Sequence, residues 1–201
     1  MTIETYVNEY MPAMGGWCSA PKALKIYDLI VEHRLKRGLE IGVFAGRSLC
    51  AVGLAMARIN GKVDGVDPFT KDAALHDESQ ENRDWWARLN LEDVMKEAQR
   101  HVNALEIRPH CEVVRCTSRD FYNRQHHDQL DFLHIDGNHS EWNSSHDVVM
   151  WVPEVRKGGI ICMDDMDWPS TGTAQKLMAH QADFHSWVSS DDHTCAFFVK
   201  R

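Results

Sequence analysis

The sequence has no hydrophobic run that approaches the ~20 residues of a membrane-spanning helix. Its N-terminal stretch, MTIETYVNEYMPAM, lacks the basic-then-apolar order of a signal peptide. Basic residues are in the minority, because 22 Lys and Arg face 30 Asp and Glu, which gives a net charge of −8. Phosphate groups and anionic membrane surfaces both require clustered cations. We therefore expect neither nucleic acid nor a membrane as a partner.

The six cysteines form no CxxC pair and lie mostly within apolar segments. In a chain of this length without a secretion signal, such cysteines are typical of free thiols in a reducing compartment. We therefore expect a cytoplasmic protein. The 43% hydrophobic and 26% charged residues are close to a globular average, which argues against a mainly disordered chain. The length of 201 residues predicts a single domain over 1–201, with 1–19 as an N-terminal arm.

Apolar runs that end at glycine, proline or aspartate alternate with segments of helical periodicity. The runs predict strands over 38–43, 62–67, 111–115, 131–135 and 160–163. The periodic segments predict helices over 20–35, 48–59, 88–104, 142–152 and 173–182. The chain then ends in a predicted hairpin of 184–188 and 195–200. This order predicts an α/β fold: a doubly wound, Rossmann-like, mostly parallel seven-stranded sheet with a C-terminal antiparallel hairpin.

The polar and glycine residues of chemical interest fall at the carboxyl ends of the predicted strands. In order along the chain these residues are Gly42, Asp67, Ser118, Asp136 and the pair Asp164-Asp165. Open α/β sheets bind ligands at that edge, near the point where the strand order reverses. The residues of 68–104 would form a lid-like insertion above the same edge.

The first strand runs into a glycine-bearing turn, Glu40-x-Gly42-x-x-x-Gly46-x-Ser48, that opens a helix. It lacks the GxGxxG spacing of a dinucleotide site, which disfavours a nicotinamide dehydrogenase. Taken alone, the two glycines also fit a simple tight connection. Asp67, at the end of the next strand, can accept hydrogen bonds from both hydroxyls of a ribose, or serve only as a turn residue before Pro68. The combination favours a nucleoside ligand.

These residues resemble the class I S-adenosylmethionine-dependent methyltransferases over about 20–201. The glycine turn is similar to their first motif, Gly65-Val66-Asp67 to the second, and 115–118 to the segment beside the adenine. The runs 134–140 (HIDGNHS) and 158–165 (GGIICMDD) resemble the family 24 group near macrocin O-methyltransferase. The resemblance implies S-adenosylmethionine as the cofactor, bound by Glu40, Gly42, Val43, Phe44, Gly46, Ser48, Asp67, Ser118 and Asp136.

Asp136 and Asp164-Asp165 end strands that we expect to be neighbours, ~4.8 Å apart, so their carboxylates can converge. Converging carboxylates need a cation, and Mg²⁺ would also lower the pKa of an acceptor hydroxyl as a Lewis acid. Alternatively, one aspartate caps a helix and another faces solvent. The resemblance supports the metal, because catechol and caffeoyl-CoA O-methyltransferases carry an Asp and an Asp-Asn pair at these places. Here Asp165 stands where those enzymes have asparagine.

His139 lies three residues after Asp136, where the catechol enzymes place a lysine base. Histidine, with an unperturbed pKa of ~6.5, can accept a hydroxyl proton near neutral pH. His139 and Asp136 are thus the predicted catalytic residues, although metal ligation and a structural role for His139 stay open.

Three tryptophans follow these motifs closely enough to line an acceptor pocket: Trp85, Trp86 and Trp168. Packing of the lid is the alternative for the pair. The leading hypothesis is an S-adenosylmethionine-dependent O-methyltransferase of a hydroxylated small molecule, assisted by Mg²⁺ or another divalent cation. A metal-independent N- or O-methyltransferase and a non-catalytic nucleoside-binding module are the alternatives. A homodimer is the default oligomeric state.

Overall fold

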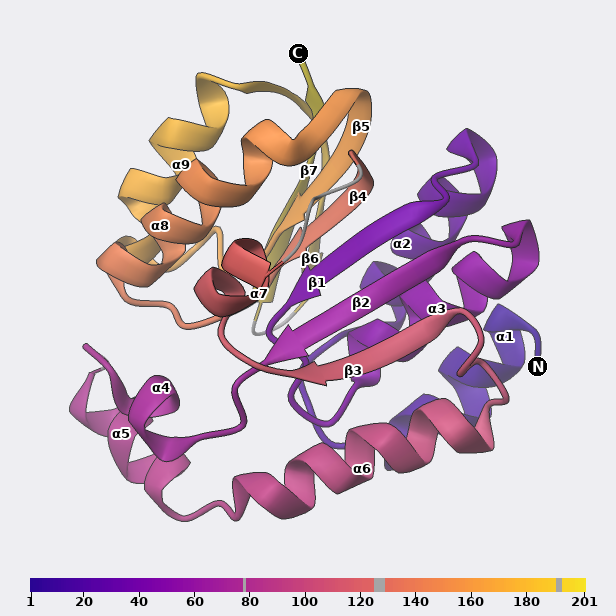
Figure 1. Ribbon diagram of the computed structural model, residues 1–201, viewed down its shortest axis with the longest axis horizontal. Coiled ribbons are helices and arrows are strands. Elements are labelled where there is room, and N and C mark those ends of the chain that lie inside the picture. Colours follow the sequence, from indigo (N-terminus) through magenta and orange to yellow (C-terminus); the bar gives the residue numbers. More distant parts are fainter. Residues whose placement is uncertain (78, 125–128, 191–192) are drawn as a thin grey trace.

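The computed structural model describes residues 1–77, 79–124, 129–190 and 193–201. Within them, seven strands form one sheet through the middle of the molecule, with helices on both faces (Figure 1). The strands are β1 (Arg37–Ile41), β2 (Lys62–Asp67), β3 (Cys111–Arg115), β4 (Leu130–Ile135), β5 (Val155–Met163), β6 (Ala182–Ser190) and β7 (His193–Lys200). Their order is β3-β2-β1-β4-β5-β7-β6. The first five are mutually parallel and β7 is antiparallel to β5 and β6, which confirms the predicted fold.

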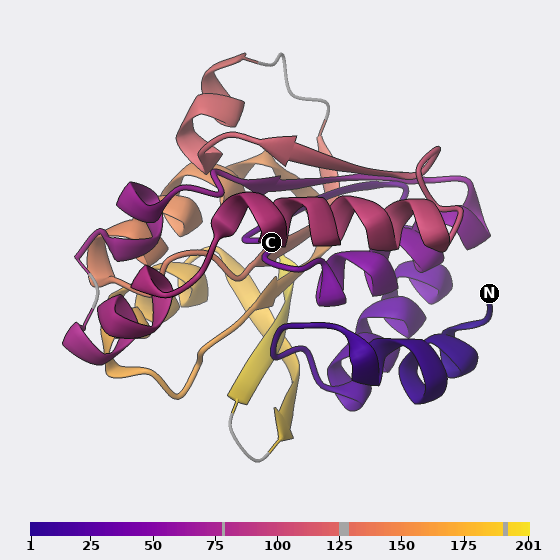
Figure 2. The same ribbon diagram turned by 90° about the horizontal axis from the view of Figure 1, so that it is seen from below.

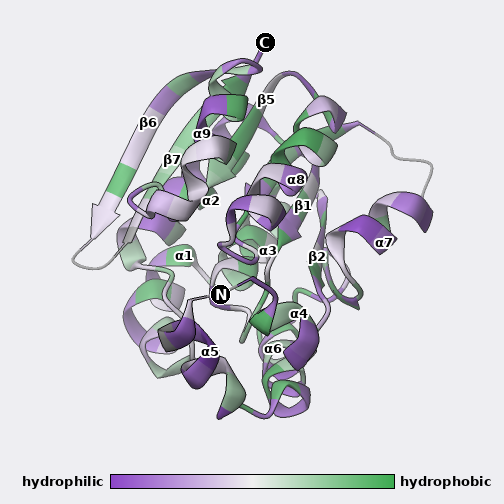
Figure 3. Ribbon diagram, turned by 90° about the vertical axis from the view of Figure 1, so that its left-hand side faces the viewer, coloured by the Kyte–Doolittle hydropathy of each residue, from purple (hydrophilic) through white to green (hydrophobic). Residues whose placement is uncertain are grey.

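Two hydrophobic clusters, one on each face, hold the helices to the sheet. The helices are α1 (Ile3–Thr5), α2 (Ala20–His33), α3 (Arg47–Ile59), α4 (Lys71–Leu75), α5 (Gln80–Ala87), α6 (Leu91–Ala104), α7 (Ser118–Arg124), α8 (Glu141–Trp151) and α9 (Gly172–Ala179). Helices α2, α3 and α6 share the first cluster with the N-terminal residues, and α7, α8 and α9 share the second (Figures 1 and 2). Hydrophobic residues are prominent on β5 and on α3, whereas α5 and α7 are largely hydrophilic (Figure 3). No helix of the described residues is long and apolar enough to cross a membrane.

Helix α2 begins where its sequence predicts. The Ser19 side chain accepts a hydrogen bond from the Lys22 amide, and a proline follows in the first turn. The helix ends at His33, two residues early, because Arg34 adopts the left-handed conformation. On its inner face Ile26 is fully buried, whereas Leu24 and Tyr27 are only half-buried.

Three segments differ from their predicted form. The N-terminal arm contains α1, a π-helix (Tyr6–Tyr10) and a 3₁₀ turn (Met11–Ala13), and its buried Tyr6 hydroxyl donates to the Arg47 carbonyl at 2.5 Å. The segment 68–104 contains two short helices, α4 and α5, followed by α6, which joins β2 to β3 and contributes to the first cluster. Strand β5 starts at Val155, earlier than predicted, and takes in the glycine pair, with Gly158 at φ +76°.

The strand order reverses between β1 and β4, which are neighbours although β2 and β3 lie between them in sequence. Backbone hydrogen bonds continue past the strand ends here: the Asp136 amide donates to the Ile41 carbonyl and the Asp164 amide to the Ile135 carbonyl. The residues after β1, β4 and β5 are therefore held side by side at one edge.

Candidate functional site

A cavity of about 990 Å³ opens at the carboxyl ends of the parallel strands, around the reversal between β1 and β4. This is the place where doubly wound sheets bind ligands, and the volume is at the upper end of small-molecule sites. Most of the predicted site residues line it: Gly42, Val43, Phe44, Ser48, Asp67, Trp85, Trp86, Ser118, Asp136, His139, Asp164, Asp165 and Trp168. Glu40 and Gly46 are not among the lining residues.

The turn after β1 is tight because it contains glycine where the chain needs it. Gly42 has φ +87°, and a Cβ there would lie 1.8 Å from the carbonyl oxygen of Asp136. Gly46, at φ +85°, donates its amide to the Val43 carbonyl at 2.8 Å and precedes α3. Phe44 adopts φ +48° without being glycine, a conformation that costs about 1–3 kcal/mol and gathers at functional sites. The backbone of this turn can therefore lie close to the backbone at the end of β4.

Asp67 fixes this turn from the end of β2. Its Oδ2 accepts hydrogen bonds from the amides of Val43 and Phe44, both at 3.0 Å, and its Oδ1 accepts from the Phe69 amide at 2.8 Å. Burial raises the pKa of this carboxyl, and the three amides oppose that rise. Each carboxylate oxygen has two acceptor sites, so Oδ1 retains one for a further donor.

Glu40 and Ser48 lie beneath the turn and bond to each other. The Ser48 hydroxyl donates to Glu40 Oε1 at 2.7 Å, and Glu40 Oε2 lies 3.0 Å from Nδ1 of His134. Both Glu40 and His134 are fully buried. Burial and the charge of Lys22 lower the pKa of His134, but Glu40 and Asp164 outweigh them and raise it to about 10. Glu40, Ser48 and His134 thus form a buried layer of polar side chains that supports the turn from below.

The ends of β4 and β5 bring two carboxylates to one buried cation. Nζ of Lys22 lies 3.3 Å from Oδ2 of Asp136 and contacts Oδ2 of Asp164. The side chain of Lys22 is only 7% exposed, and those of Asp136 and Asp164 are 28% and 12% exposed. Burial lowers the pKa of Lys22, yet the two carboxylates outweigh it and hold that pKa well above its usual range.

The two carboxyls respond differently to the same surroundings. Burial and the charge of Asp164 raise the pKa of Asp136 well above its usual range, against Lys22 and His134. Burial also opposes ionisation of Asp164, but Lys22 and His134 outweigh it and lower the pKa of Asp164. The pKa shifts of the two neighbours therefore have opposite directions although both side chains face Lys22.

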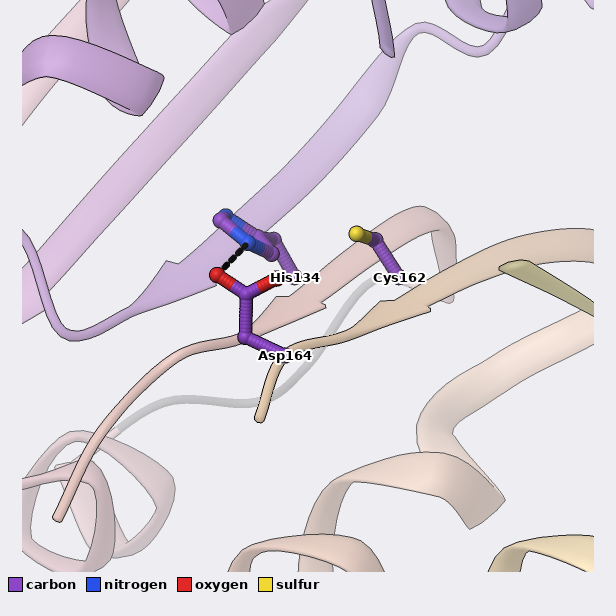
Figure 4. A group of neighbouring side chains, drawn as sticks. All are labelled: His134, Cys162 and Asp164. Carbon is purple, nitrogen blue, oxygen red and sulfur yellow. Dashed lines mark ion pairs between the residues drawn. The ribbon is translucent and has the colours of Figure 1, made fainter. Parts of the chain in front are cut away.

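His134, Cys162 and Asp164 lie close together on β4 and at the end of β5 (Figure 4). The imidazole points toward the Asp164 carboxylate, with Nε2 and Oδ2 3.7 Å apart, and the thiol points to the same side of the sheet. Among the described residues this is the one set of three His, Cys, Asp or Glu side chains with ligand atoms within 4.8 Å of one another. The three aspartates predicted as magnesium ligands do not form such a set.

Asp165 pairs instead with the predicted base. Its Oδ2 lies 2.9 Å from Nδ1 of His139, and the ring of His139 packs on Trp168 with centroids 4.7 Å apart. Asp165 has φ +54° and, like Phe44 and Phe69 at this edge, is left-handed without being glycine. A carboxylate at Nδ1 fixes the tautomer so that the lone pair of a neutral ring lies on Nε2. The pair has the arrangement of a general base and its orienting carboxylate.

Aromatic rings gather over the turn after β1. Trp85 and Trp86 of α5 both contact Phe44, with centroid separations of 5.9 and 5.8 Å. Trp17 contacts Phe44 at 5.3 Å and Trp85 at 4.9 Å. The cavity therefore has an aromatic wall built from three separate parts of the chain.

Ser118, at the start of α7, donates its hydroxyl to Oδ1 of Asp147 on α8 at 2.5 Å. Asp147 lines the cavity but is only 6% exposed. Burial raises the pKa of Asp147 to about 6, although the Ser118 hydroxyl and the Arg119 charge oppose the rise.

Sequence reasoning missed several of these residues, although signals were present. Lys22 is a cation one turn before the buried Ile26, which places a charge on the face toward the core. His134 interrupts an apolar strand, and Asp147 precedes the buried Val148. A charged or polar side chain on a buried face is the common signal.

Comparison with known proteins shows the family and the fold of the chain. A sequence model of a methyltransferase domain matches residues 39–166. An O-methyltransferase of Bacillus cereus in complex with SAH is 14% identical, with TM-score 0.65 over 98% of this chain and 88% of that chain. TomG, an O-methyltransferase of Streptomyces achromogenes involved in tomaymycin synthesis and solved with SAM, is 16% identical, with TM-score 0.66 over 99% and 88%. A cofactor-bound protein from MTB is 15% identical, with TM-score 0.67 over 94% and 84%. No match was found among curated proteins.

Proposed function

The chain belongs to the methyltransferase family whose model spans residues 39–166, and from this premise we propose that it is an S-adenosylmethionine-dependent O-methyltransferase of a hydroxylated small molecule. One observation carries the proposal. A single cavity contains both the turn after β1, which Asp67 fixes, and the His139–Asp165 pair. The proposed site for the methyl donor and the proposed proton acceptor therefore share one cavity.

The cofactor half of the site comprises the turn after β1, Asp67 and Ser118. Oδ1 of Asp67 retains an acceptor site for a ribose hydroxyl, while its amide contacts keep the turn rigid. Glu40 and Ser48 support the turn from beneath. The Ser48 hydroxyl donates a hydrogen bond to the carboxylate of the buried Glu40. When bound, S-adenosylmethionine supplies a methyl group on a sulfonium, which is already a good leaving group.

The acceptor half needs a proton acceptor more than an electrophilic catalyst. His139 takes the proton of the acceptor hydroxyl on Nε2 while Asp165 holds Nδ1. The turn after β1 and Asp67 would hold the cofactor, which would supply the methyl group and accept the electron pair of its C–S bond as the new O–C bond forms. Asp136 lies beside Gly42 at the point where the strand order reverses, between the cofactor half and the acceptor half of the site. The remaining task of the protein is alignment of the attack.

The aromatic wall indicates the kind of acceptor. Trp85 and Trp86 close the cavity over Phe44, and Trp168 lies beside the base. Aromatic walls with a few polar groups suit a flat or apolar body that carries a hydroxyl. We propose that α4 and α5 form the lid of this pocket, a narrower segment than 68–104, since α6 packs in the core. The excess of acidic residues fits an acceptor that is neither nucleic acid nor a membrane lipid surface.

The magnesium prediction needs three carboxylates that share one ion, and the side chains do not fit that requirement. Asp136 and Asp164 face Lys22, and Asp165 faces His139. The proposed reaction therefore has no step that passes through a metal ion. This arrangement favours the metal-independent alternative, in which Asp136 and His139 act directly on the acceptor.

A screen of acceptors tests the proposal. Purified protein with S-adenosylmethionine is incubated with phenols, sugars and matched amines, and products are read by mass spectrometry. We expect a mass gain of one methylene on hydroxylated compounds, and none from their amine analogues. Methylation of the amines alone would favour an N-methyltransferase. Binding of S-adenosylhomocysteine without turnover of any class would favour a non-catalytic nucleoside-binding module.

A further inference from the structure

A buried lysine occupies the place where a metal ion was predicted. Lys22 lines the cavity, its side chain is 7% exposed, and its Nζ contacts both Asp136 and Asp164. Lysine is almost never this deeply buried unless it is paired. The side chain therefore sits here because of the carboxylates it meets.

The local helix gives no other reason for this placement. Lys22 lies in the first turn of α2, directly after the cap provided by Ser19. The N-terminal end of a helix carries partial positive charge and disfavours a cation. Pairing with Asp136 and Asp164 outweighs both this repulsion and the loss of hydration.

Each aspartate of the predicted metal site has a basic side-chain partner within the chain. Lys22 faces Asp136 and Asp164, and His139 faces Asp165 at 2.9 Å. Mg²⁺ requires oxygen ligands at about 2.0–2.1 Å in a near-octahedral arrangement. An ammonium in contact with Oδ2 of Asp164 takes the position that such an ion would need.

We propose that Lys22 is the resident cation of this site and that methyl transfer here needs no divalent metal ion. The inference rests on the proposed function, because it assigns the cation of that same reaction. Lys22 is a positioning residue: it holds Asp136 and Asp164 together at the switch point. An ammonium has three N–H donors, and the carboxylates engage two of them. Its fixed charge also stabilises negative charge that develops on the acceptor oxygen as His139 takes the proton.

Metal binding to the intact protein tests the proposal without an acceptor. Protein stripped of metal with EDTA is titrated with Mn²⁺ and followed by electron paramagnetic resonance. Calorimetry with S-adenosylhomocysteine, with and without Mg²⁺, runs in parallel. We expect no stoichiometric Mn²⁺ site in the wild type, and the same S-adenosylhomocysteine affinity in both buffers.

Two substitutions sharpen the result. Lys22→Met keeps the length of the side chain but removes its charge, so Asp136 and Asp164 become free to bind Mn²⁺ at about one ion per chain. Lys25→Met, on the same helix and only half-buried, is the matched control and should bind no Mn²⁺. If Lys22→Met fails to fold, Lys22→Arg is the second variant. It keeps the charge, and it should bind no Mn²⁺, like the wild type.

The outcomes separate this inference from the proposed function. Stoichiometric Mn²⁺ binding by the wild type, lost in Asp164→Asn while S-adenosylhomocysteine still binds, would overturn the role of Lys22 and leave the methyltransferase intact. Failure of the wild type to bind S-adenosylhomocysteine in any buffer would overturn the proposed function itself, and this inference with it.

Discussion

Asp147 should make the protein less stable as the pH rises, which is unusual for an aspartate. The side chain is 6% exposed, and burial raises its pKa to about 6 from the model-peptide value of 3.8. A raised carboxyl pKa means that the folded state holds the proton more tightly than the unfolded state does. The contribution of Asp147 is therefore most favourable below pH 4 and is lost as the pH rises through about 6.

The magnitude follows from the size of the shift. One pKa unit corresponds to about 1.4 kcal/mol, so a shift of roughly two units amounts to about 3 kcal/mol between pH 4 and pH 7.5. Replacing Asp147 with Asn removes the ionisation and keeps an oxygen that can accept the Ser118 hydroxyl. Relative to the wild type, Asp147→Asn should gain up to about 3 kcal/mol over this range of pH.

The difference in free energy of unfolding between wild type and variant can be measured by urea denaturation. The titrations are run at about pH 4.5, 6 and 7.5, which are buffer values spaced about the pKa. Asp120→Asn, at an exposed carboxylate of the neighbouring α7, is the matched control. Its difference from wild type should change little with pH. If the difference between Asp147→Asn and wild type is equally constant, Asp147 does not carry a raised pKa, and the account of its burial is wrong.

Three further substitutions test the site. Gly42→Ala should destabilise the fold by more than about 4 kcal/mol, because its Cβ would meet the Asp136 carbonyl at 1.8 Å; Gly172→Ala, with nothing within 4 Å, should gain about 0.5 kcal/mol in the same urea titration, and equal effects would contradict the geometry. His139→Ala should lower turnover of an identified acceptor by about 10²–10⁴-fold without changing S-adenosylhomocysteine affinity, and a loss below about threefold would remove His139 from the mechanism. Asp67→Asn places an amide donor against the backbone amides of the turn, so S-adenosylhomocysteine affinity measured by calorimetry should fall about tenfold or more, and unchanged affinity would exclude Asp67 from the cofactor site.

Periodicity and strand-end chemistry were sufficient to predict the sheet. Strands β2 and β3 match their predicted bounds: β2 ends directly before Pro68, and β3 is a short segment with two adjacent valines. The start of β5 at Val155 was missed, since a glycine pair inside a strand looks like a turn in sequence. The N-terminal helices were missed as well, because their burial depends on contacts with α2 and on the Tyr6 hydrogen bond to the Arg47 carbonyl rather than on a local pattern.

The candidate site also has a part that the sequence predicts and a part that it does not. Backbone topology alone brings Asp136 and Asp164 together, so the sequence could predict that they converge. The direction of each side chain depends on its partners, and Lys22 comes from a helix 114 residues away from Asp136 along the chain. A single sequence does not indicate such a distant pair, and for that reason a metal ion was predicted where the chain has its own cation.

The most direct test of the central claim is a calorimetric titration of the wild-type protein with S-adenosylhomocysteine, beside Asp67→Asn. We expect micromolar binding at one site per chain, and weaker binding by the variant, because the turn after β1 and Asp67 form the proposed cofactor half of the cavity. Absence of binding by folded wild-type protein would contradict the methyltransferase function and the roles assigned to His139 and Lys22 that depend on it.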